Sequence, residues 1–221
     1  MIILPKYHLP NEFFTILKMN NNNKIIKFLI DLDGFFIHTT ASRGTRVKFL
    51  PKELGVTDLE EWKTNCYTFK LNMSFSQLSS TDKKTVAYLR KYHHGLVFRD
   101  YPEDLPRYSL YRIMKELIRE CNNDGYYIAF KGGNVEKNLL KRLNFQRFID
   151  LEEYNCPKFQ LLLEDREIEE LALQLLPPLK YRCDRHSTFC NSLVPYCSAY
   201  EPAHFGAWCI RNLSTHCIPN F

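Results

Sequence analysis

Cysteine and histidine residues gather near the C-terminus, and this cluster constrains the fold more than any other feature of the sequence. Four of the eight cysteines and two of the seven histidines lie between Cys183 and Cys209. Cys183 and His186 have the spacing C-x2-H, and Cys190 and Cys197 follow them. Thiolate and imidazole are the ligands that tetrahedral zinc prefers, and a two-residue gap lets a tight turn direct both at one ion. The pattern predicts a zinc-pinned loop.

A helix is expected directly after this loop. From Ser198 onward the chain can form a helix whose apolar side carries Ala199, Phe205, Ala207 and Trp208. The alternative interpretation of the cysteines is a set of free thiols in a hydrophobic core, because free cysteine packs as a small apolar residue. We expect reduced thiols rather than disulfides, since the N-terminal sequence does not have the pattern of a secretory signal.

The composition is that of an ordinary globular protein. The chain has 221 residues, of which 45% are hydrophobic, and a net charge of +5 at pH 7. This mild basicity permits contact with nucleic acid without requiring it. The apolar runs are too short to span a membrane, so the sequence predicts an intracellular protein of the cytoplasm or nucleus that has no membrane contact.

An acidic pair follows the first apolar run. Residues 24–30 are rich in isoleucine and phenylalanine and predict a buried strand, which leads into Asp31, Leu32, Asp33 and Gly34. Two carboxylates that are two residues apart on a strand point to the same face. Gly34 is expected to allow a sharp turn. Asp31 and Asp33 are therefore a candidate metal-binding pair, and the alternative is a pair of carboxylates at the end of a strand.

The remaining elements predict a mixed α/β fold. Strands are expected over residues 46–56, 66–71, 126–130 and 145–151, and helices over 79–95, 106–121, 136–143 and 158–176, the last one in one or two pieces. The opening strands favour antiparallel pairing, and the later alternation of strands and helices favours parallel pairing with helices on both faces. We expect an N-terminal arm over residues 1–23, one domain over 24–211 and a C-terminal tail over 212–221.

This order of elements, with its motifs, resembles the RNase H-like superfamily and, within it, the DEDDh 3′–5′ exonucleases. The segment IIKFLIDLDGFF is similar to the first exonuclease motif, and YHHGLVF is similar to the segment before the family's next helix. The second motif falls on YIAFKGGNVEKNLL, where Glu136 is the nearest acid, and the third falls on CSAYEPAHFGAW. There Cys197 replaces the histidine, and Pro202, with Glu201 beside it, replaces the last aspartate. The resemblance implies an RNase H-like mixed sheet flanked by helices and, if the acids function, two Mg²⁺ ions.

A reduced acid set combined with Cys/His ligands is similar to the Maelstrom domain, a relative of these exonucleases that binds zinc through Glu, Cys, His and Cys. The resemblance implies a structural zinc held by Cys183, His186 and Cys197. For the fourth ligand we favour Cys156, because thiolate outcompetes carboxylate at a closed structural site. Cys190 and a glutamate such as Glu53 remain alternatives.

Two basic groups are candidate nucleic-acid contacts. Arg46 and Lys48 lie on the second expected strand, whereas Lys137, Lys141 and Arg142 lie on the short helix that follows Gly133. If both groups border the cleft of the former active site, they could hold a single strand by phosphate contact and stacking. The alternative is a solvated surface.

The sequence therefore favours a zinc-stabilised, catalytically degraded exonuclease-like domain that binds single-stranded nucleic acid, with RNA preferred to DNA. Asp31, Asp33 and Glu136 are the candidate catalytic residues, and they are vestigial under this hypothesis. The first alternative is an active nuclease that uses Asp31 and Asp33 with Mg²⁺ or Mn²⁺. The second alternative is a scaffold for protein partners.

Overall fold

The fold is built on a mixed sheet, as the sequence predicts. The computed structural model describes residues 18–19, 24–41, 44–176, 186 and 197–213. Within this part of the chain the strand order is β4-β3-β2-β5-β6. The antiparallel strands are β2 (Lys24–Ala41), β3 (Gly44–Asp58) and β4 (Lys63–Thr68). The strands β5 (Tyr127–Phe130) and β6 (Phe148–Asp150) are parallel to β2 and to each other, and β1 (Lys18–Met19) pairs antiparallel with the start of β2.

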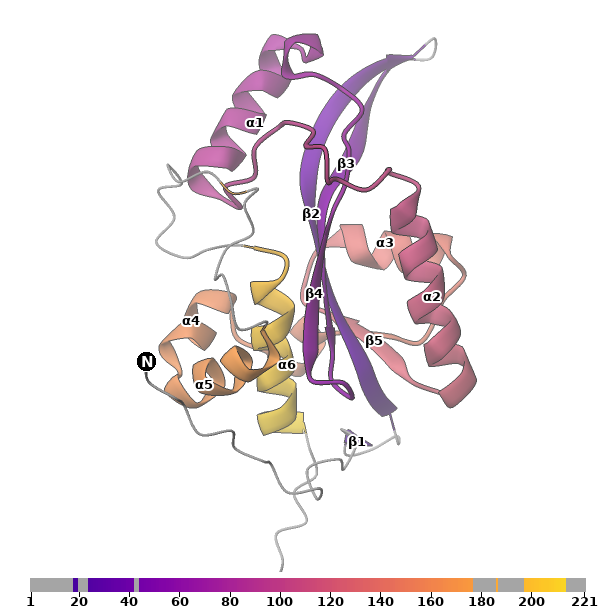
Figure 1. The fold of residues 1–221 in the computed structure, drawn as a ribbon, viewed down its shortest axis with the longest axis vertical. Helices are drawn as coiled ribbons and strands as arrows, with labels where there is room; N and C mark the ends of the chain where they lie inside the picture. Colours follow the sequence, from indigo (N-terminus) through magenta and orange to yellow (C-terminus); the bar gives the residue numbers. More distant parts are fainter. Residues whose placement is uncertain (1–17, 20–23, 42–43, 177–185, 187–196, 214–221) are drawn as a thin grey trace, which may run out of the picture.

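Helices cover both faces of this sheet (Figure 1). One face of β2, with Phe28, Ile30 and Leu32, packs against α2 (Ser109–Asp124) and α3 (Asn134–Arg142). The other face, with Ile26 and Leu29, packs against α4 (Phe159–Glu164), α5 (Arg166–Leu175) and α6 (Tyr200–Leu213). Because successive strand side chains point to opposite faces, the continuous apolar run of β2 supplies both cores. The α/β class with a helix-flanked mixed sheet is thus confirmed.

The main difference from the sequence prediction is that β2 does not turn at Gly34. It continues to Ala41 and forms a long hairpin with β3, and α1 (Ser80–Tyr92) packs on this hairpin. The register shifts after the pair Asp33–Glu53, so that Gly34 faces Pro51 and one residue of β3 is extra. A Cβ atom at Gly34 would lie 2.1 Å from a backbone oxygen of the partner strand. This position needs glycine because two backbones approach closely, not because the chain turns.

The helix boundaries follow local signals. Ser79 caps α1, since its hydroxyl accepts a hydrogen bond from the Asp82 backbone N–H at 3.1 Å. The expected helix over 158–176 is divided at Asp165, whose carboxylate caps α5. Two short 3-10 helices, η2 (Phe75–Gln77) and η3 (Leu151–Tyr154), complete the described elements. No described helix has the length and apolar character needed to cross a membrane.

Candidate functional site

Four carboxylates from three elements meet on β2. Asp31 and Asp33 belong to β2, Glu136 to the first turn of α3 and Glu201 to the first turn of α6. The pairing of β5 with β2 stops at Leu29, which leaves the backbone of β2 beyond it open on that side. The Glu136 side chain takes the place of a strand partner there, because its Oε1 accepts a hydrogen bond from the Leu32 backbone N–H at 3.0 Å.

The start of α6 reaches the site because β3 carries a glycine. A Cβ atom at Gly55 would lie 1.2 Å from the carbonyl oxygen of Ser198, so only glycine lets this segment pass. The Ser198 backbone N–H donates to Glu53 Oε2 at 3.0 Å, and its hydroxyl donates to Asp33 Oδ2 at 3.2 Å. These contacts hold the segment before α6 against β2 and β3. They thereby position Cys197 near Glu53, and Glu201, in the first turn of the helix, near the other acids.

Burial, and after it the neighbouring charges, raises the pKa values of these carboxylates. Loss of solvent raises the pKa of Asp33 to about 8, and the neighbouring Glu53 charge adds to this. The pKa of Glu136 rises to about 8 because of burial and the Asp31 charge. Burial, followed by the neighbouring carboxylates, also raises the pKa values of Asp31 and Glu201 well above their usual range. One oxygen of Asp31, Oδ2, is buried without a hydrogen-bond partner. Clustered carboxylate oxygens with an unpartnered member fit a hard divalent cation such as Mg²⁺ or Mn²⁺.

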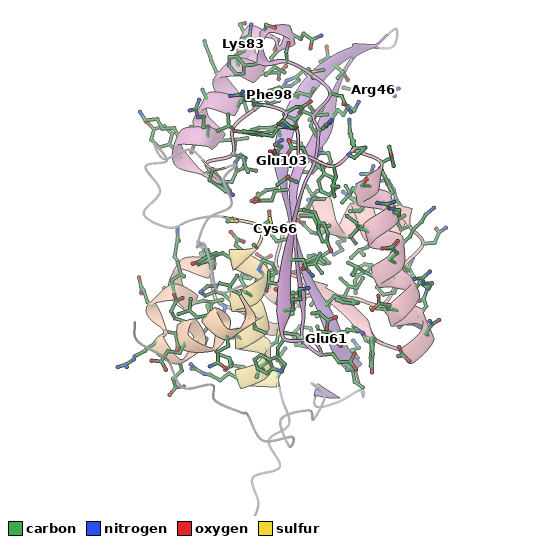
Figure 2. The ribbon with its side chains drawn as sticks, in the orientation of Figure 1. Arg46, Glu61, Cys66, Lys83, Phe98 and Glu103 are labelled. Carbon is green, nitrogen blue, oxygen red and sulfur yellow. The ribbon has the colours of Figure 1, made fainter. Side chains whose placement is uncertain are left out.

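A second group beside these acids could hold a softer metal ion. The ligand atoms of Glu53, Cys66 and Cys197, contributed by β3, β4 and the segment before α6, all lie within 4.8 Å of one another. Figure 2 shows Cys66 near the start of α6. His186 is adjacent, with Nε2 at 3.1 Å from Glu53 Oε2 and Nδ1 at 2.5 Å from the carbonyl oxygen of His94. Because a carbonyl oxygen only accepts, Nδ1 carries a proton, which orients the ring and directs Nε2 to the group.

Two of the residues predicted as ligands lie at this group, Cys197 as a member and His186 beside it, whereas a third lies elsewhere. Cys183 lies outside the described residues, as does the alternative Cys190. Cys156 does not join the group: it is buried among the apolar side chains that pack between the sheet and α4–α6, and burial raises the pKa of its thiol to about 12. Such a thiol behaves as a small apolar side chain.

Sequence reasoning named Glu53 only as an alternative and missed Cys66. Cys66 pairs with Gly55 across the β3–β4 ladder, so strand register and not local spacing brings it to the site. One signal was present in the sequence, because Glu53, Cys66, His186 and Cys197 occur in the order Glu, Cys, His, Cys that was expected from the resemblance to the Maelstrom domain. Glu201 was not predicted as a site acid either, because the sequence places Pro202 where the last acid is expected.

The predicted basic residues lie in two separate places. Arg46 is exposed near the tip of the β2–β3 hairpin (Figure 2), and the exposed Lys48 follows it on β3. Lys137, Lys141 and Arg142 lie on α3, which packs on the sheet face opposite α6. The structure therefore does not bring the two groups together along one cleft.

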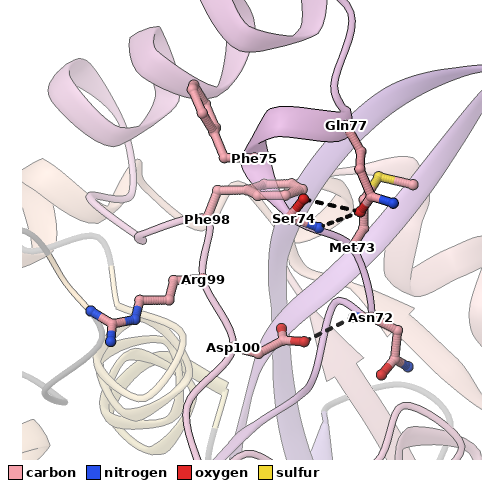
Figure 3. Close-up of a pocket in the computed structure, with 8 residues that line it drawn as sticks. All are labelled: Asn72, Met73, Ser74, Phe75, Gln77, Phe98, Arg99 and Asp100. Atoms are coloured by element: carbon pink, nitrogen blue, oxygen red, sulfur yellow. Dashed lines mark hydrogen bonds between the residues drawn. The ribbon is translucent and has the colours of Figure 1, made fainter.

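An open recess of about 420 Å³ lies apart from both groups of ligands (Figure 3). Its polar side chains are already hydrogen-bonded to the backbone around the recess. Asp100 accepts hydrogen bonds from the Leu71 and Asn72 N–H groups at 2.6 and 3.1 Å, and Gln77 Oε1 accepts one from the Ser74 N–H at 2.7 Å. It contains none of the clustered carboxylates or cysteines, so we assign it no part in the chemistry. Its lining residues are Asn72, Met73, Ser74, Phe75, Gln77, Phe98, Arg99 and Asp100.

No family model, curated protein or solved structure gives a significant match to this chain.

Proposed function

We propose that this protein is a nuclease that depends on Mg²⁺ or Mn²⁺ and cleaves single-stranded nucleic acid. The observation that carries the proposal is the meeting of Asp31, Asp33, Glu136 and Glu201 at one point of the sheet. The sequence favours a degraded site because the second motif lacks its aspartate, Cys197 replaces the histidine of the third motif, and Pro202 replaces its last aspartate. Glu201 supplies that acid, and the alternative of an active nuclease becomes the better one.

The four carboxylates would hold the cations. When bound, such ions polarise the scissile phosphate and lower the pKa of a water molecule that attacks it. The protein itself holds the acids in a fixed arrangement. The Leu32 N–H orients Glu136, and the Ser198 hydroxyl orients Asp33. Clustered carboxylates also repel an anionic substrate, so cleavage should require the cation and not merely be stimulated by it.

We also propose that zinc occupies the group formed by Glu53, Cys66, His186 and Cys197. Two thiolates, an imidazole and a carboxylate are a typical tetrahedral set for this metal. Its role would be structural, because it would join β3 and β4 to the segment that leads into α6. Elemental analysis should find one zinc per chain, lost in Cys66→Ser and Cys197→Ser. Cys156→Ser should keep it; loss of zinc in Cys156→Ser but not in Cys66→Ser would restore the fourth ligand predicted from the sequence.

Cleavage is tested with labelled single-stranded RNA and DNA in the presence of Mg²⁺ or Mn²⁺. Asp31→Asn and Glu201→Gln should abolish it while retaining zinc and the circular dichroism spectrum. Glu61→Gln, an exposed glutamate of the β3–β4 turn, is the matched control and should remain active. Cleavage that persists in the first two variants would remove the carboxylates from the mechanism.

One observation favours a second candidate, a binding domain without catalysis. Cys197 lies beside the acids where the exonucleases that the sequence resembles have their histidine base, and a thiolate bound to zinc would not accept a proton from water. Tight binding of single strands with no cleavage under any divalent cation would support this candidate. If the protein neither bound nor cleaved nucleic acid, a scaffold for protein partners would be the remaining hypothesis.

A further inference from the structure

The exposed side of α1 is basic and aromatic. Its only acidic residue, Asp82, is buried and accepts hydrogen bonds from the backbone N–H and the imidazole of His38 at 3.1 and 2.7 Å. The helix packs on the β2–β3 hairpin through Val86 and Leu89. The exposed side chains that lie together along one side of the helix include two cations and two tyrosines. We call them the α1 face: Lys84, Tyr88, Lys91 and Tyr92.

The spacing of these residues makes one continuous surface. Lys84, Tyr88 and Tyr92 follow one another at four-residue intervals and therefore lie along one side of the helix. Tyr88 and Tyr92 are 60% and 50% exposed, and their ring centroids are 5.3 Å apart. The Lys91 ammonium lies 4.9 Å from the centroid of the Tyr92 ring. In the described part of the chain neither Lys84 nor Lys91 forms an ion pair, so their charge is available to an anion.

The α1 face lies on the same side of the sheet as the start of α6 (Figure 1). Phe35 and Ile37, on which α1 packs, continue the alternation of Asp31 and Asp33 along β2 and point to the same face. Just after α1, the carbonyl of His94 accepts a hydrogen bond from His186, and Leu96 forms a β-bridge with His186. The C-terminal end of the helix is therefore coupled to the residues beside the carboxylates.

We propose that the α1 face binds single-stranded nucleic acid and delivers it to the four carboxylates. Bases would stack on Tyr88 and Tyr92, and phosphates would contact Lys84 and Lys91. Exposed aromatic rings alternating with cations, without exposed acids, are the combination that binds single strands with little sequence preference. This inference rests on the proposed function and names the surface that would serve it. An acidic protein partner would use the cations but would gain little from two exposed tyrosine rings side by side.

The test measures binding of a fluorescent single-stranded oligonucleotide by anisotropy over a series of salt concentrations, with Ca²⁺ in place of Mg²⁺. Tyr88→Ala/Tyr92→Ala should weaken binding by about five- to a hundred-fold for each stacked base lost, with the salt dependence unchanged. Lys84→Ala/Lys91→Ala should also reduce the slope of log affinity against log salt by about 1.4, the value for two phosphate contacts to a single strand.

Matched controls come from α2, on the opposite face of the sheet. Tyr108→Ala/Tyr111→Ala removes two exposed tyrosines, and Arg112→Ala/Lys115→Ala removes two exposed cations. Both should bind like the unchanged protein. Equal losses in the α1 and α2 variants, or none in either, would overturn the proposal, and the second outcome would redirect the search to a protein partner for the α1 face.

A short substrate separates this inference from the proposed function. A dinucleotide offers too few bases to occupy both tyrosines and the carboxylates. Its cleavage should be the same in the α1 variants and in the unchanged protein, whereas KM for a long oligonucleotide should rise. Cleavage of both substrates with no effect of the α1 variants would refute the α1 face alone. No cleavage and no binding by the unchanged protein would refute the proposed function and the α1 face together.

Discussion

The ion pair between Lys52 and Asp104 offers a sharp test of how this fold is held together. Both side chains are fully buried. Lys52 is the extra residue of the β3 bulge, and its ammonium also donates to the carbonyl oxygen of Phe69 at 3.1 Å. Asp104 also accepts hydrogen bonds from the Thr68 hydroxyl at 2.7 Å and from the Tyr101 backbone N–H at 2.9 Å. The pair joins the bulge to the loop that precedes α2.

The expected magnitude follows from this burial. Removing one member of a buried pair leaves an uncompensated charge and costs about 3–5 kcal/mol, whereas an exposed pair contributes about 0–1 kcal/mol. Against a typical total of about 5–15 kcal/mol for a domain, Lys52→Met should remove a large share of the free energy of unfolding. Arg166→Met is the matched control, because Arg166 forms an exposed pair with Glu170 one helical turn away.

Urea unfolding followed by tryptophan fluorescence measures these free energies. Lys52→Met and Asp104→Leu should each be strongly destabilising, and the double variant should lose much less than the sum, since no buried charge remains in it. The reasoning is refuted if Lys52→Met costs no more than Arg166→Met. It is also refuted if the two single losses add in the double variant.

The same pair predicts a pH dependence. Burial alone would raise the pKa of Asp104, but hydrogen bonds from Lys52, Thr68 and the Tyr101 backbone, together with the Lys52 charge, outweigh burial and lower it. The folded state then binds fewer protons than the unfolded chain, whose pKa is about 3.9. The contribution of Asp104 is complete above that value and is lost as pH falls through the lower, folded-state pKa. The double variant should lack this part of the acid destabilisation.

Three further predictions address the metal group, the close approach at β3 and the start of α1. A zinc chelator should lower the melting temperature, and Cys66→Ser should reproduce the effect, because a closed zinc site contributes directly to folding; an unchanged melting temperature in both cases would exclude the site. Gly55→Ala should cost about 1–3 kcal/mol in urea and reduce zinc content, because the new methyl group would displace the Ser198 backbone; full zinc content would show that the segment shifts without harm. Ser79→Ala should cost about 1 kcal/mol through loss of the α1 cap, and Ser76→Ala is a serine control for the same thermal unfolding measurement.

The order of strands and helices was predictable because each element carries its own periodic pattern and stop signal. The long hairpin was not, because Gly34 reads locally as a turn residue. Its actual role depends on Leu50, whose carbonyl occupies the space that a side chain would need. A contact between strands that are not yet paired leaves no signal in the sequence of either one.

The ligand set shows the same limit. The spacing of Cys183 and His186 drew attention to nearby cysteines, whereas the structure gathers Glu53 and Cys66 through the antiparallel register of β3 with β4. Cys156 satisfied the preference for thiolate, but its surroundings are apolar and its thiol is buried in the core. Residue type was thus a poor guide to which residues meet, because the chain's pairing and not its local spacing brings them together.

The carboxylates can be weighed by what they cost the folded protein. An acid whose pKa is raised is less stable in its charged form when folded, and each unit of the shift corresponds to about 1.4 kcal/mol. Asp33 and Glu136, both with pKa values near 8, and their neighbours Asp31 and Glu201 therefore oppose folding near neutral pH, and neutral side chains of similar size would be more favourable. A divalent cation reverses the sign of this term, because it converts mutual repulsion into shared attraction. Without a cation the cluster destabilises the folded state, and with one it becomes favourable. We therefore propose that the cluster binds a metal ion that takes part in the chemistry.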